Sequence, residues 1–155
     1  MMYQLLLSIH SIGRWCLLLS LIYSIHLAYR GYFTERKFNS KDDFFRHFTA
    51  TLSHIQLVIG MFLYTKSPLV KHFFVHFKDQ IHDFHTLFFG VIHVLLMLTA
   101  VVIVTIGSAL AKRDRTDKDK YRTMLLWFLA AFITIMIAIP WPFSPIASRP
   151  YFRLW

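Results

Sequence analysis

The stretch FHTLFFGVIHVLLMLTAVVIVTIGSALA, residues 84–111, decides the fold of this chain. It contains no Asp, Glu, Lys or Arg, and as a helix it is about 42 Å long, more than a hydrocarbon layer of roughly 30 Å requires. We therefore predict a membrane-spanning helix here. His93 lies within it, where an imidazole has no water to bond and must find a partner inside the protein or bind a ligand.

Three other apolar runs accompany this stretch, at 3–29, 44–64 and 123–143. The chain is 56% hydrophobic and only 16% charged, a composition typical of a multi-pass membrane protein. We predict an all-α integral membrane protein, a single domain of residues 1–155 built as an up-and-down bundle of four transmembrane helices. The remainder, 144–155, is rich in proline and aromatic residues and is predicted to lie along the membrane interface.

The net charge of +9 comes mostly from basic residues that flank the apolar runs, so we expect contact with a lipid bilayer and not with nucleic acid. Segments 30–46 and 112–122 together hold eleven Lys and Arg residues, against five beyond the other ends of the spans. Because basic loops stay in the cytoplasm, this asymmetry predicts that both termini lie on the outer side.

Three predicted helices each bring one histidine into the outer half of the bundle. At 1.5 Å per residue, His10 lies roughly 10 Å below the outer end of its helix, and His54 and His93 roughly 15 Å below theirs. Two imidazoles on facing helices are the axial ligands of a bis-His haem. The matching depths favour His54 and His93 as the pair, with His10 and His93 as the alternative. In a third interpretation the histidines only form hydrogen bonds between helices.

Arg14 follows His10 by one helical turn and shares its face. A buried arginine needs a partner, and the apolar runs contain no carboxylate. A haem propionate, or the anionic group of another ligand, would supply the missing charge. Backbone carbonyls and water are the alternative partners.

The outer loop 66–83 and the start of the next span contain a second group of histidines. Their spacings of i, i+4 and i, i+3 allow two pairs to share helical faces, as ligands of zinc or copper do. This weaker metal-site alternative involves His72, His76, His82 and His85.

With these residues identified, the chain resembles a family of small bacterial four-helix membrane proteins labelled cytochrome b-like. The matching pieces are HSIGRW at 10–15, SHIQLVIG at 53–60, AVVIVTIG at 100–107 after His93, the pair Lys112 and Arg113, and IPWP at 139–142. The resemblance implies b-type haem and membrane electron transfer. For a bacterial protein we expect the inner membrane, where the charge asymmetry puts the termini on the periplasmic side.

Our leading functional hypothesis is a membrane b-type cytochrome that carries one haem in the outer half of the bundle. It would move electrons between a quinol and a redox partner, as a subunit of a larger complex or alone. The alternatives are a non-redox accessory subunit of a membrane complex and a metal-handling membrane protein. No nucleophile and base are assembled for hydrolysis, so an electron-transfer or accessory subunit is more expected than a stand-alone enzyme.

Overall fold

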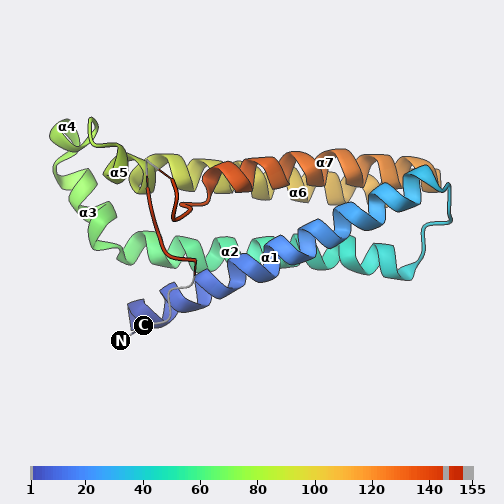
Figure 1. The fold of residues 1–155 in the computed structure, drawn as a ribbon, viewed down its shortest axis with the longest axis horizontal. Coiled ribbons are helices and arrows are strands. Elements are labelled where there is room, and N and C mark those ends of the chain that lie inside the picture. Colours follow the sequence, from blue (N-terminus) through green and yellow to red (C-terminus); the bar gives the residue numbers. More distant parts are fainter. Residues whose placement is uncertain (1, 145–146, 152–155) are drawn as a thin grey trace.

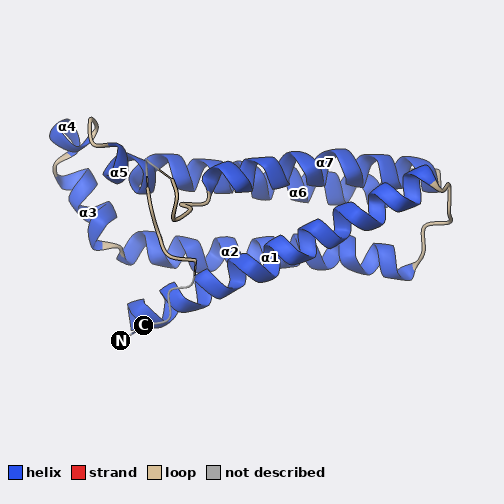
Figure 2. Ribbon diagram, viewed as in Figure 1, coloured by secondary structure: helices blue, strands red, loops and turns tan. Residues whose placement is uncertain are grey.

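A computed structural model describes residues 2–144 and 147–151 of the chain (Figure 1). Four long helices dominate it: α1 (Met2–Phe33), α2 (Ser40–Lys66), α6 (His93–Arg113) and α7 (Asp117–Ala138). Shorter segments join α2 to α6: α3 (Pro68–Val75), α4 (Phe77–Gln80), α5 (Phe84–Leu87) and the π-helical η1 (Phe88–Ile92). Within the described ranges there are helices and loops but no strand (Figure 2).

In the described part of the chain, four helical stretches are long and apolar enough to cross a membrane: α1, α2, the run Phe84–Arg113 and α7. Large apolar side chains are exposed along them, for example Leu19 at 66%, Phe62 at 58% and Ile137 at 65%. Water would not tolerate so much apolar surface, whereas lipid does. The prediction of an all-α, four-span membrane bundle is confirmed, and the chain is a multi-pass membrane protein.

The four long helices run up and down, with α1 and α6 diagonally opposite each other. Helix α1 packs on α2 and α7, and α6 packs on the same two neighbours. The loops 34–39 and 114–116 lie at one end of the bundle, here named the charged end (Figure 1). The N-terminus, α3–α5 and the segment after α7 lie at the other end, here named the terminal end.

Helix caps explain why two helices begin earlier than the hydrophobic runs predict. At α2, the Asn39 side chain accepts from the backbone of Asp42, and the Asp42 carboxylate accepts from the Asn39 N–H. This capping box starts the helix at Ser40 instead of 44.

At α7, the Thr116 side chain accepts from the Asp119 N–H, so the helix starts at Asp117 instead of 123. It ends at Ala138 and not at 143, because Pro140 and Pro142 cannot continue it.

The region 66–83, predicted as a loop, contains two short helices. Ser67 caps α3 by accepting from the Val70 N–H, and Pro68 occupies the first helical position, where its missing N–H does no harm. Phe73 of α3 is fully buried and its ring lies against Gly90 of η1. The connection therefore folds back onto the bundle at the terminal end.

Helices approach each other closely toward the charged end. The ring of Tyr121 packs so closely on α1 that a Cβ at Gly31 would overlap it. The buried hydroxyls of Ser20 and Ser24 lie 2.6 and 2.8 Å from the Thr49 hydroxyl and bind α1 to α2. Small and hydroxyl-bearing side chains let membrane helices approach closely in this way.

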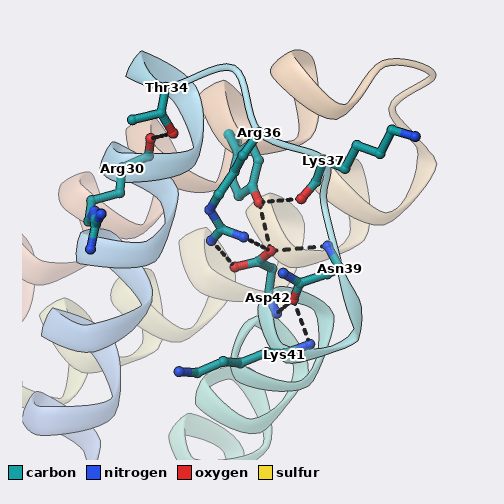
Figure 3. Close-up of polar contacts among 8 residues, drawn as sticks. Arg30, Thr34, Arg36, Lys37, Asn39, Lys41 and Asp42 are labelled. Carbon is teal, nitrogen blue, oxygen red and sulfur yellow. Dashed lines mark hydrogen bonds and ion pairs between the residues drawn. The ribbon is translucent and has the colours of Figure 1, made fainter.

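A buried carboxylate completes the charged end (Figure 3). Asp42 is 0% exposed and accepts two hydrogen bonds from Arg36, at 2.5 and 2.8 Å. Tyr121 donates to the same carboxylate at 2.6 Å, which ties α7 to the first turn of α2. The hydrogen bond to Asp42 raises the pKa of Arg36 above its usual value, so the guanidinium keeps its charge.

Candidate functional site

A cavity of about 420 Å³ lies between α1, α2 and α6 in the terminal half of the bundle. Most of its lining is apolar, and this size is typical of small-molecule and cofactor sites. A few polar side chains also line it: Tyr3, His10, Arg14, Gln56, Tyr64, His93 and Arg149. They come from α1, α2, the first turn of α6 and the segment that follows α7.

His93 is held in one orientation by the end of α7. Its Nδ1 lies 2.8 Å from the carbonyl oxygen of Ala138. A carbonyl only accepts, so Nδ1 carries the hydrogen and Nε2 of the neutral ring keeps its lone pair. The Ala138 carbonyl is available because the residue four positions later, Pro142, has no N–H to donate. Histidines that bind metals are oriented by this kind of bond to the second nitrogen.

His10 faces the same cavity from the diagonally opposite helix. Gly60 of α2 makes room for it: a Cβ at Gly60 would be 3.2 Å from the His10 Cε1. Gln56 donates from Nε2 to the His10 carbonyl oxygen at 2.7 Å and so fixes α2 against this turn of α1. Within the described residues, the His10 Nδ1 is buried and has no hydrogen-bond partner.

Arg14 lies one turn along α1 and also borders the cavity. Its Nη2 donates to the carbonyl oxygen of Tyr151 at 2.5 Å, but its Nε is buried without a partner in the described part of the chain. Arg14 shares the cavity lining with His10 and His93. The guanidinium therefore places a positive charge, and one donor still to be satisfied, beside the two imidazoles.

Residues 147–151, here named the strap, cross from the end of α7 to α1 (Figure 1). Trp15 donates to the Tyr151 carbonyl at 3.0 Å, beside the bond from Arg14. Arg149 of the strap lies with its guanidinium carbon 4.7 Å from the centre of the Phe89 ring and borders the cavity. The strap thus adds a second guanidinium to the site. Other parts of the predicted tail, 145–146 and 152–155, lie outside the described residues.

His54 does not reach this cavity. It is exposed on the outer surface of α2, where its Nε2 lies 2.9 Å from the Thr105 hydroxyl of α6. The favoured pair His54 and His93 is therefore not brought together, whereas the alternative pair, His10 and His93, lines one cavity. Depth along the helix suggested His54, but the direction in which a side chain points depends on helical phase. The cavity-facing side of α2 carries Ser53, Gln56 and Gly60, at i, i+3 and i+7. This spacing could have shown that His54 points away from the cavity.

The histidines of the outer loop are not gathered into one site. The ring centres of His72 and His76 are 4.6 Å apart, and His76 Nδ1 lies 3.3 Å from the His72 carbonyl oxygen. His82 is exposed, and the His85 ring contacts Phe89 instead. Across residues 2–144 and 147–151, no group of three or more His, Cys, Asp or Glu side chains is arranged to hold a bare metal ion. A haem iron differs, because it takes only two ligands from the protein.

No protein-family model, curated protein or solved structure matches this chain. The functional argument therefore depends on the geometry of the cavity.

Proposed function

We propose that this protein is a membrane b-type cytochrome whose haem occupies the cavity between α1 and α6. His10 and His93 would be the axial ligands, and Arg14 and Arg149 would neutralise the propionates. This assignment keeps His93 and Arg14 from the sequence-based hypothesis and replaces His54 by its stated alternative, His10.

One observation carries the proposal. In the described part of the chain only His10, Arg14 and Asp114 have a buried side-chain nitrogen or oxygen without a hydrogen-bond partner. Two of these three residues are one helical turn apart and border one cavity, with His93 on the helix opposite. Native proteins satisfy nearly all buried polar groups, so a cluster of exceptions points to a ligand. Two imidazoles and an arginine are the groups that a haem with its propionates requires.

The residues around the cavity have clear tasks in this proposal. The Ala138 carbonyl sets the ring of His93 so that Nε2 is free to bind iron. Gly60 and Gln56 position His10, and the apolar lining excludes water and lowers the local dielectric. Haem bound there supplies one-electron redox chemistry, and its potential is tuned by these ligands, by charge and by burial.

The cellular role is part of the proposal. A haem near the terminal end suits transfer of electrons between a quinol and a redox partner or a neighbouring membrane subunit. We place the protein in the bacterial inner membrane with both termini, and hence the haem, on the periplasmic side, because the basic residues concentrate at the charged end.

The decisive measurement is a visible absorption spectrum of the purified protein, oxidised and dithionite-reduced, with a pyridine haemochrome assay. The protein should be expressed with an ample haem supply. We expect one haem b per chain, lost in His10→Ala and in His93→Ala. His54→Ala is the matched control, since it removes the same group outside the cavity, and should keep its haem. A colourless wild-type protein, or a folded double variant His10→Ala, His93→Ala that retains full haem, contradicts the proposal.

A further inference from the structure

A second cavity, of about 650 Å³, lies at the charged end, away from the proposed haem site. It is bordered by the first turns of α2, the end of α6 and the first turns of α7. The side chains that matter for its chemistry are Ser40, Arg46, His47, Lys112, Lys120 and Phe44. The proposed function leaves this cavity without a role.

The floor of the cavity contains a buried cation that is already neutralised. Arg46 is 4% exposed and its Nε and Nη2 pair with Asp43 at 2.9 and 2.8 Å. Its Nη1 donates to the carbonyl and hydroxyl oxygens of Ser108 at 2.9 and 2.6 Å. These bonds fix the wall formed by α2 and α6, and they consume the charge of Asp43, the one carboxylate among the lining residues that the structure describes.

Two lysines give the cavity a net positive charge. Lys112 forms no ion pair with any residue that the structure describes. Lys120 lies 3.8 Å from Asp117, at the limit of an ion pair, and its ammonium is 5.5 Å from the centre of the Phe38 ring. Both lysines line the same cavity, and Ser40 and His47, whose side chains can form hydrogen bonds, line it as well. This set suits a compact oxyanion with several acceptor oxygens.

We propose that this cavity binds a phosphate group, held by Lys112 and Lys120. The same chemistry is found in the headgroup of an anionic phospholipid and in free inorganic phosphate. The lipid is the better fit, because Phe44 at the rim is 57% exposed on a helix that enters the membrane, where an acyl chain can cover it. Basic pockets between transmembrane helices bind lipid headgroups by this arrangement.

The test uses the full chain in neutral detergent, with phosphatidylglycerol, phosphatidylcholine and inorganic phosphate as separate probes. The double variant Lys112→Gln, Lys120→Gln should bind phosphatidylglycerol about tenfold more weakly than the wild type. The control Arg113→Gln, Arg115→Gln removes two charges from the same segment outside the cavity and should change the Kd less than about twofold. Single Lys112→Gln serves in its place if the double variant does not fold.

Each outcome decides the proposal. Selective weakening in the lysine variant, together with a preference of the wild type for phosphatidylglycerol over phosphatidylcholine, supports the lipid. Inorganic phosphate that competes fully and binds as tightly supports the phosphate site and assigns it to free phosphate. Equal weakening in both variants, or no preference for either phosphate probe over phosphatidylcholine, overturns it. The haem spectrum is independent of this result because the two cavities share no residue.

Discussion

The two halves of this bundle differ in how far their buried polar groups are satisfied: among the described residues, the charged end has one unpartnered buried atom, the Asp114 Oδ2, whereas two such atoms border the cavity at the terminal end. Toward the charged end, the Asp42 carboxylate receives four hydrogen bonds from three residues, and the hydroxyls of the α1–α2 contact bond to one another. Toward the terminal end, the bundle opens into a cavity where buried nitrogens of His10 and Arg14 have no partner among the described residues. Satisfied groups hold helices together, whereas the unsatisfied cluster indicates a place for a ligand.

The most damaging change should be the removal of the buried carboxylate. Asp42→Ala leaves Arg36 and Tyr121 without their shared acceptor, and we expect a loss of about 3 kcal/mol in the free energy of unfolding. Unfolding in mixed micelles titrated with a denaturing detergent measures it. Asp79→Ala, at an exposed carboxylate, is the control and should change little. Equal losses of unfolding free energy in both variants would show that the buried carboxylate contributes no more to stability than an exposed one.

A larger residue at Gly60, beside His10, tests the cavity toward the terminal end. The side chain of Gly60→Leu would occupy the space of the His10 ring, and we expect about a tenfold drop in haem affinity. Haem titration of the apoprotein measures it. Val58→Leu, on the lipid-facing side of the same helix, is the control. Unchanged affinity in Gly60→Leu would remove His10 from the site.

Removing a single hydroxyl near the charged end should have a smaller effect on stability. Tyr121→Phe keeps the ring against Gly31 but loses the bond of 2.6 Å to Asp42. We expect the free energy of unfolding to fall by about 1 kcal/mol. Tyr29→Phe, at an exposed ring, should have no effect. A null result at Tyr121 would mean that Arg36 and the Asn39 N–H satisfy the carboxylate without it.

The smallest effect is expected at the hydroxyl cluster between α1 and α2. Thr49→Val preserves the shape of the side chain and removes its bonds to Ser20 and Ser24. Hydrogen bonds between membrane helices contribute about 0.6 kcal/mol, so we expect a decrease in unfolding free energy of that order. Thr51→Val, exposed on the same helix, is the matched control. A stabilised Thr49→Val protein would show that packing outweighs the bonds.

The four spans could be predicted because the length and apolar composition of each run are enough to identify them. The helix starts were predictable in principle, since Asn39 and Asp42 have the spacing of a capping box, but a search for apolar runs passes over them. Burial of Asp42 was not predictable, because it depends on Tyr121, which reaches it from a helix 79 positions away.

The candidate site was predicted in part. Sequence placed His10, Arg14 and His93 in one half of the bundle, and the structure puts them around one cavity. Depth along the helices could not decide between His10 and His54, because that choice depends on which helices are diagonal and on helical phase. The oriented ring of His93 depends on the Ala138 carbonyl, whose availability follows from Pro142, 49 positions later in the chain than His93.

The strap has a consequence for the biogenesis of the protein. Synthesis proceeds from the N-terminus, so residues 147–151 leave the ribosome after all four long helices have been made. The helices that line the cavity are therefore made before the strap, which adds Arg149 to the lining. Arg14 and Trp15 then fasten that segment through one carbonyl, that of Tyr151. In the proposed cytochrome, the haem would enter the space between the long helices before the strap is fastened to α1.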